Sequence, residues 1–302
     1  MTGESTASGE TLDDLRRAID RIDDSILDLL NERAALGARI AAAKRASDDA
    51  GSYGGVVLRP GREMEILRRL LRRATGLFPK AVIIRMWREM FAALISLQGS
   101  MSMAVYMPAR GAGYLELARD TYGSLTPASP WQTTAPVVRA VAEGEVSVGV
   151  LPLPRFEESN PWWPMLFFET ANTPRIISRL PLCGPGPGRG DGVEAFAIGR
   201  MPVEPTGHDR SLVAIETTPD LSRGAVRTLV ESSGLPLLEI MDSHTIGEER
   251  RQYLLEISEY VAADDARIAK LASDHQVGRA VVIGGYAVPF TTDELAPSAP
   301  SA

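Results

Sequence analysis

LRRAIDRIDDSILDLLNERAALGARIAAAK (residues 15–44) decides the fold of the first third of the chain. Apolar residues recur there every three or four positions with charged residues between them, which is the spacing of one face of an α-helix. No Pro or Gly interrupts the run before Gly37, and Thr11 with Asp14 suits an N-terminal cap. We therefore predict one helix over about 11–48, unusually long for a globular domain. Its apolar positions are Leu15, Ile19, Ile22, Ile26, Leu29, Leu36 and Ile40.

Two shorter helices are predicted to follow. Pro60 suits the first turn of a helix over about 60–76, and apolar residues at helical spacing predict a third helix over about 79–98. We expect residues 1–10 to be a loose N-terminus and residues 11–100 to form an all-helical domain. The residues expected on the inward face of the third helix are Ile83, Trp87, Met90, Phe91 and Leu94.

After residue 100 the pattern changes to alternating strands and helices. It predicts an α/β domain over 101–205 and a βαββαβ unit, the ferredoxin-like arrangement, over 206–290. Residues 291–302, rich in Pro, Ser and Ala, are expected to be a disordered tail. The expected helices are 113–121, 135–143, 223–233 and 264–275, and the expected strands are one beginning at 103 and those at 146–153, 194–199, 211–216, 236–241, 252–261 and 279–285.

The composition excludes several classes of protein. With 302 residues, 44% hydrophobic and 24% charged, the chain has enough apolar material for two or three cores and is not a disordered protein. A net charge of −7 argues against a general nucleic-acid binder. The single Cys183 excludes an intramolecular disulfide framework and a multi-cysteine metal site. With no signal-peptide pattern and no apolar run of about 18–20 residues, we expect a cytoplasmic protein without a membrane span.

Cations on the long predicted helix are candidates for binding an anionic ligand. Arg33 and Lys44 lie 11 residues apart, within about 20° of the same helix face. Arg16 and Arg33 lie 17 residues apart, or about 25 Å along the helix, so one small ligand cannot contact both within one chain. If Arg16 binds the ligand, it reaches the site of a second copy. A rod of about 55 Å with a continuous apolar stripe also favours an intertwined dimer.

Three further candidates lie at the ends of the shorter helices. RPGRE (59–63) places Arg62 and Glu63 near a helix N-terminus, where anions are favoured. Gln98 ends the third helix as a neutral hydrogen-bond donor. Together with the cations of the long helix, these side chains suit a small dianion with a hydroxyl group and a polar bridge. The alternative interpretation is a charged, solvated helix surface.

The pattern L-R…I-D-x-I-D…L-L-x-x-R…K at 15–44, followed by RPGRE and a helix ending in ALISLQ, resembles the all-helical chorismate mutases. The resemblance covers about 11–98. It implies a three-helix intertwined dimer with two shared sites. The implied reaction is the Claisen rearrangement of chorismate to prephenate, which needs no cofactor.

The resemblance also implies a role for each candidate side chain. Arg33 matches a carboxylate-binding arginine of the family, and Arg16 matches one that reaches across the dimer. Lys44 and Gln98 match the donors to the ether oxygen. The remaining matches are Arg62 as the arginine of the second helix, Glu63 as the hydroxyl-binding glutamate, and Leu94 at a position where relatives often have a Ser that binds substrate.

The rest of the chain resembles prephenate dehydratase and its ACT regulatory domain more weakly. VYMPARGAGY (105–114) resembles the opening strand and glycine loop, and GEVSVGVLPL (144–153) resembles the strand before a Pro-Ile-Glu-Asn-Ser/Thr motif. VVIGGY (281–286) resembles the closing strand of an ACT domain.

The dehydratase motifs themselves are altered. Pro154 and Arg155 stand where the family has Glu and Asn. The family's catalytic Thr-Arg-Phe triplet is replaced by Val193, Glu194 and Ala195. NTPR (172–175) offers a displaced Thr/Arg pair, but its flanking residues do not fit. We therefore expect this part not to dehydrate prephenate.

We predict a multidomain chain, with an all-α intertwined-dimer mutase domain, a reduced α/β dehydratase-like domain and a ferredoxin-like, ACT-like domain. Its predicted function is chorismate mutase in phenylalanine and tyrosine biosynthesis, with chorismate as substrate, no cofactor or metal, and a homodimer as the assembly. Neither nucleic acid nor a membrane is an expected partner. Two alternatives stay open: a sensor that binds an aromatic amino acid or another shikimate-pathway enzyme, and a bifunctional mutase/prephenate dehydratase.

Overall fold

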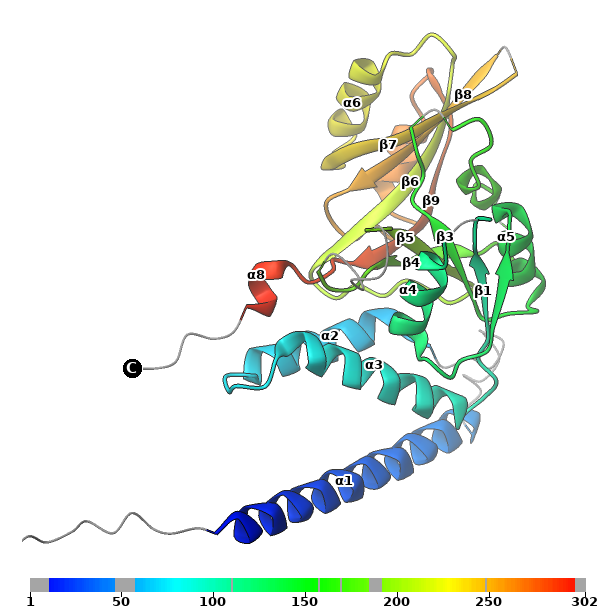
Figure 1. Cartoon of the computed structure of the whole chain (residues 1–302). Coiled ribbons are helices and arrows are strands. Elements are labelled where there is room, and N and C mark those ends of the chain that lie inside the picture. Colours follow the sequence, from blue (N-terminus) through cyan, green and yellow to red (C-terminus); the bar gives the residue numbers. More distant parts are fainter. Residues whose placement is uncertain are drawn as a thin grey trace, which may run out of the picture. The chain divides into compact units, whose positions relative to one another are not determined.

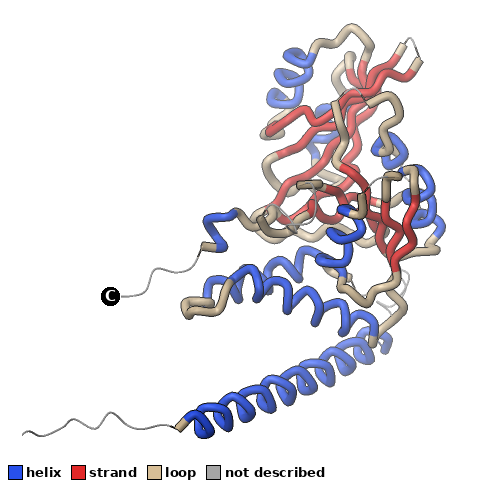
Figure 2. The backbone as a smooth tube through the Cα atoms, viewed as in Figure 1, coloured by secondary structure: helices blue, strands red, loops and turns tan. Residues whose placement is uncertain are grey.

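The computed structural model describes residues 11–46, 58–109, 111–156, 158–168, 170–184, 192–247 and 249–296. The chain divides into two compact units, residues 1–52 and residues 53–302. Each unit is described by itself below, with the element labels of Figure 1. Figure 2 distinguishes the helices from the strands by colour.

The described residues of the first unit form one long helix, α1 (Leu12–Ala46), which confirms the long helix predicted from the apolar stripe. Its start is capped as expected, because the Asp14 N–H donates to the Thr11 hydroxyl at 3.2 Å and the Thr11 N–H donates to the Asp14 carboxylate at 3.1 Å. Ten large apolar side chains along α1 are between 42% and 63% exposed. Since such a stripe is normally buried, α1 presents an apolar face that is suited to pack against a partner.

Helices α2 (Pro60–Arg73) and α3 (Lys80–Ser96) open the second unit, near the predicted bounds. Their apolar faces do not form a separate core but share one with α4 and strands of the sheet. The buried side chains of α3 are Ile84, Arg88, Phe91 and Ile95. Of the residues predicted to face inward, Phe91 is buried, and Ile83, Trp87 and Met90 are partly buried against the same core. The most buried face of α3 is shifted by about one residue from the predicted face, because α3 packs against α4 as well as against α2.

Nine strands of the described residues form one sheet in the order β2-β1-β3-β5-β4-β9-β6-β8-β7. β1 pairs in parallel with β2 and β3, whereas β5 is antiparallel to both β3 and β4. The strands are β1 (Met103–Tyr106), β2 (Ala128–Trp131), β3 (Val148–Pro152), β4 (Arg175–Leu180), β5 (Ala195–Gly199), β6 (Asp209–Thr217), β7 (Leu237–Ile246), β8 (Arg250–Ile257) and β9 (Val277–Ala287).

One close backbone approach joins the two halves of this sheet. β4 and β9 pair in parallel only at Ile176 and Gly284. Gly284 has φ of 145°, and a Cβ there would lie 2.3 Å from the Ile176 carbonyl oxygen, so only glycine fits this position. The α/β part and the ferredoxin-like part, predicted as separate domains, are thus continuous through one sheet.

The α/β part contains the predicted helices α4 (Gly113–Tyr122) and α5 (Thr134–Glu143). It also contains three elements that were not predicted: β2, β4 and the 3₁₀ helix η2 (Trp163–Leu166). β2 includes Pro130 and lies at the edge of the sheet, where a missing backbone N–H is tolerated. Trp162, which precedes η2, and Trp163, its first residue, contribute two buried indoles to a core that also contains residues of the sheet.

The C-terminal part confirms the βαββαβ order, with helices α6 (Arg223–Ser232) and α7 (Ala266–Ala272). Its four strands lie in the order β9-β6-β8-β7, all antiparallel, which is the ferredoxin-like topology. Both helices share one core with β6 and β8. The expected disordered tail from residue 291 instead begins with α8 (Thr292–Leu295), because Thr291 and Glu294 form a capping box.

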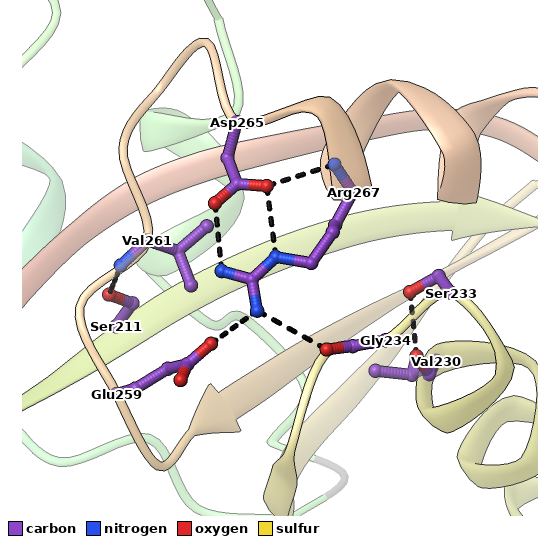
Figure 3. A network of polar contacts seen from close by, with 8 residues as sticks. All are labelled: Ser211, Val230, Ser233, Gly234, Glu259, Val261, Asp265 and Arg267. Atoms are coloured by element: carbon purple, nitrogen blue, oxygen red, sulfur yellow. Dashed lines mark hydrogen bonds and ion pairs between the residues drawn. The ribbon is translucent and has the colours of Figure 1, made fainter.

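Arg267 connects three segments of the ferredoxin-like part (Figure 3). Its guanidinium donates to both carboxylate oxygens of Asp265, at 3.0 and 2.8 Å, and to the Gly234 carbonyl at 3.2 Å. It also donates to the carboxylate of Glu259. Asp265 caps α7 by accepting the Arg267 N–H, and the hydrogen bonds from Arg267 lower the pKa of the Asp265 carboxyl.

Replacing Arg267 by alanine is expected to lower the free energy of unfolding by about 1 kcal/mol at pH 7. The carboxyl of Asp265 has a depressed pKa in the folded protein, so its contribution is present above the unfolded value of about 4 and is lost as pH falls through the folded value. Urea unfolding at pH 7 and pH 3 should show the difference from the original protein shrinking at the lower pH. Arg227→Ala, which removes an exposed pair with Glu231, is the matched control and should change little. An Arg267→Ala loss that stays equal at both pH values would contradict this account.

Candidate functional site

Three of the six predicted site residues lie on α1. The helix is unbroken from Leu12 to Ala46. The distance along the helix that prevents Arg16 and Arg33 from contacting one small ligand therefore also applies in the folded chain. The exposed guanidinium of Arg16 lies 3.4 Å from a carboxylate oxygen of Asp13. Arg33 is partly buried. Lys44 lies in the last turns of the helix, and its side chain is outside the described residues.

The other three residues belong to the second unit. Arg62, in the first turn of α2, is exposed and donates to the Glu65 carboxylate at 2.9 Å. Gln98 follows the end of α3, is partly buried, and its backbone N–H donates to the Ile95 carbonyl at 2.9 Å. Each of the two units therefore holds half of the predicted set.

Glu63 differs from its neighbours because it is buried. Glu63 is 7% exposed, and one of its carboxylate oxygens accepts a hydrogen bond from Nη1 of Arg88 on α3. Arg88 was not among the predicted residues. The sequence did contain a signal for this residue. Position 88 has the same helical spacing as the apolar Ile84, Phe91 and Ile95, so an arginine there is buried and needs a partner. The structure thus brings one predicted substrate-binding residue together with an unpredicted cation.

The altered dehydratase motifs fall around the middle of the sheet. Pro154 and Arg155 follow the end of β3. Glu194 immediately precedes β5, and its carboxylate accepts from Arg179 on β4 at 3.0 Å. The carboxylate that stands in the Thr-Arg-Phe triplet is therefore engaged by a neighbouring arginine.

The alternative Thr/Arg pair in NTPR (172–175) makes local contacts. The hydroxyl of Thr173 lies 2.7 Å from that of Thr170. Arg175 begins β4 and donates to the Leu166 carbonyl at 3.1 Å. Both side chains thus support the turn that leads from η2 into β4.

A cluster of charged and polar side chains lies where β4 meets the ferredoxin-like strands. The Tyr286 hydroxyl donates to the buried carboxylate of Glu256, and Arg179 lies 3.3 Å from that hydroxyl and 3.6 Å from the carboxylate. Burial raises the pKa of Tyr286, so the phenol stays protonated and donates. These groups, with Glu194 and Arg210, border a cavity of about 470 Å³. Because Arg179 on β4 pairs with both Glu194 and Glu256, the cluster joins the two parts of the unit.

Within the described ranges, no group of three or more His, Cys, Asp or Glu is placed to hold a metal ion. The described helices also include none long and apolar enough to cross a membrane. Burial raises the pKa of the Cys183 thiol, which disfavours the nucleophilic thiolate.

Comparison with known proteins assigns the helical part. Residues 15–99 match the family described as Chorismate mutase type II. The segment that contains the motifs of α1, α2 and α3 is therefore similar to chorismate mutase type II domains.

The relatives named as bifunctional chorismate mutase/prephenate dehydratase are similar over a longer stretch. The protein from Aquifex aeolicus is 32% identical over 149 residues, which are 48% of this chain and 39% of that protein. The protein from Pseudomonas aeruginosa is 28% identical over 147 residues, 49% of this chain and 40% of that protein. The aligned stretches of 149 and 147 residues are longer than the segment 15–99 that matches the mutase family, so the similarity extends beyond that segment. The matched region spans about two fifths of the length of these relatives.

Among solved structures, the prephenate dehydratase of Arthrobacter aurescens in complex with L-Phe is similar to this chain with a TM-score of 0.45 and 14% identity. The match covers 66% of this chain and 94% of the Arthrobacter chain.

Proposed function

We propose that the chain is a chorismate mutase that rearranges chorismate to prephenate. The observation that carries the proposal is the match of residues 15–99 to the mutase family. The motif residues support it, since Arg16, Arg33 and Lys44 lie on one unbroken helix and Arg62 and Glu63 open α2.

To catalyse the rearrangement, the protein must hold the substrate in one conformer and stabilise the charge that develops on its ether oxygen. Bidentate arginine contacts suit the two carboxylates of the substrate, a role we assign to Arg33 and to Arg16 of a second protomer. Restricting the substrate to its reactive conformer lowers the entropic part of the barrier. Lys44 and Gln98 donate to the ether oxygen, where negative charge develops as the C–O bond breaks. None of these steps needs a proton transfer, so we expect activity to persist at neutral pH.

A homodimer follows from the same assignment. The exposed stripe of α1 supports it, because ten large apolar side chains on one helix are a face that normally lies buried against a partner. A second copy of α1 supplies such a partner and places its Arg16 in the neighbouring site. We place this assembly in the cytoplasm.

The test of the mutase proposal is consumption of chorismate by the purified full-length chain. We expect saturable loss of chorismate with prephenate as the product and no added cofactor. A full-length, folded dimer that leaves chorismate unchanged would contradict the proposal and would favour the sensor alternative. Activity that appears only after a shikimate-pathway enzyme is added would also favour that alternative.

We further propose that residues 101–205 no longer dehydrate prephenate. The support is chemical: Val193 and Ala195 offer no hydroxyl group, and the carboxylate of Glu194 is paired with Arg179. A bifunctional enzyme is the competing proposal, favoured by the relatives' names and by the similarity beyond residue 99.

Prephenate supplied directly to the purified chain at pH 7 is expected to remain unconverted. The reason is that departure of the hydroxyl needs a donor that the replaced triplet does not provide. Phenylpyruvate is followed by absorbance in alkali, with a no-enzyme sample to correct for spontaneous conversion. Enzyme-dependent formation of phenylpyruvate would establish the bifunctional alternative.

The ferredoxin-like part is proposed as a regulatory module for an aromatic amino acid, and the division into 11–100, 101–205 and 206–290 remains our proposal for the functional parts. Its βαββαβ topology supports an ACT-like assignment. Adding L-phenylalanine to the chorismate assay tests it, with a change in rate expected for an effector and no change for a structural module.

A further inference from the structure

Arg88 is a buried cation that connects three helices of the second unit. Its side chain is 6% exposed and that of Glu63 is 9% exposed. Nη1 donates to the Glu63 carboxylate on α2, and Nε donates to the Thr121 carbonyl on α4 at 2.5 Å. The guanidinium carbon also lies 5.8 Å from the ring centre of Phe91 and 5.7 Å from that of Tyr122.

These contacts determine how Glu63 is held. A buried carboxylate needs a partner charge, and among the described residues Arg88 is the cation that pairs with it. The pair engages one oxygen of Glu63, the atom Oε2, and restricts the side chain to one orientation. The same contact therefore also fixes the direction of the other oxygen, Oε1.

We propose that Arg88 is a positioning residue, which holds Glu63 in the orientation that receives the substrate hydroxyl and couples it to α4 of the α/β part. The inference rests on the proposed mutase function. Arg88 itself does not touch the substrate. Because the same guanidinium binds the Thr121 carbonyl, a change in the position of α4 is transmitted to Glu63.

The test compares Arg88→Met with the original chain in steady-state chorismate kinetics. Loss of a charged contact to a substrate-binding carboxylate is expected to raise KM about tenfold or more, while kcat stays within about threefold. A competitive dicarboxylate inhibitor that lacks the hydroxyl group should bind Arg88→Met and the original chain equally well. Arg85→Met is the matched control, since Arg85 on the same helix forms an exposed pair with Asp120, and it should leave KM unchanged.

Two further variants keep the outcome decisive. Glu63→Gln is expected to raise KM like Arg88→Met, and Glu63→Gln/Arg88→Met should be no worse than either, because both act through one hydrogen bond. The double variant also removes both buried charges, so it can be measured if Arg88→Met alone fails to fold. An unchanged KM in the folded Arg88→Met or double variant would overturn the inference, as would equal weakening of the inhibitor without a hydroxyl. An inactive original chain would instead show that the proposed function itself is wrong.

Discussion

Replacing Lys44 by alanine is expected to lower kcat for the rearrangement of chorismate by about two to three orders of magnitude. The reason is that its ammonium group is assigned to the ether oxygen, where charge develops only in the transition state. Interactions of that kind affect kcat rather than KM. The measurement is the initial rate of chorismate loss at saturating substrate, with circular dichroism to confirm that the helices remain.

The chain offers a matched control for this substitution. It contains three lysines, and Lys270 lies on α7 of the ferredoxin-like part, where it donates to the Ser232 carbonyl. Lys270→Ala should leave kcat unchanged. Gln98→Ala, which removes the second donor, should lower kcat in the same way as Lys44→Ala. A folded Lys44→Ala protein with unchanged kcat would refute the assignment of Lys44 to the ether oxygen.

Mixing two inactive variants is expected to restore activity if the site is shared between protomers. Arg16→Ala and Arg33→Ala chains each lack one arginine of both sites in their own homodimer. A mixed dimer holds one site with both arginines and one with neither, so random exchange at equal amounts should restore about a quarter of the original activity. The measurement is the rate of chorismate loss after exchange, compared with each variant alone.

The mixing experiment has its own control. Arg16→Ala mixed with itself, or with an Arg16→Ala/Arg33→Ala chain, should stay inactive because no complete site forms. If exchange of subunits is demonstrated and activity is not restored, that result would contradict the shared site. Full activity of Arg16→Ala alone would show that Arg16 does not bind substrate.

Local patterns were sufficient for the elements that have a strong period of their own. The 3.6-residue stripe of α1 and the alternation of βαββαβ in the ferredoxin-like part both led to correct predictions, because each element carries the information in its own residues. β2 and β4 were missed, since β2 contains Pro130 and the short run that forms β4 follows a Pro-broken segment. Their place in the sheet depends on neighbours that are distant in sequence.

The candidate site shows the same division. The types and spacing of Arg62 and Glu63 could be predicted, because both lie in one motif at the start of α2. The pairing of Glu63 with Arg88 could not, since it depends on how α3 turns its face toward α4. A charged residue inside a buried helical stripe is the signal that was available. The joining of the two C-terminal parts through Ile176 and Gly284 likewise depends on tertiary packing.

The most direct test of the account is one time course of the purified full-length chain with chorismate at pH 7, following chorismate and phenylpyruvate together. We predict that chorismate disappears, that prephenate accumulates, and that phenylpyruvate forms only after acid is added. Chorismate that persists beyond its uncatalysed decay would contradict the central claim that this chain is a mutase.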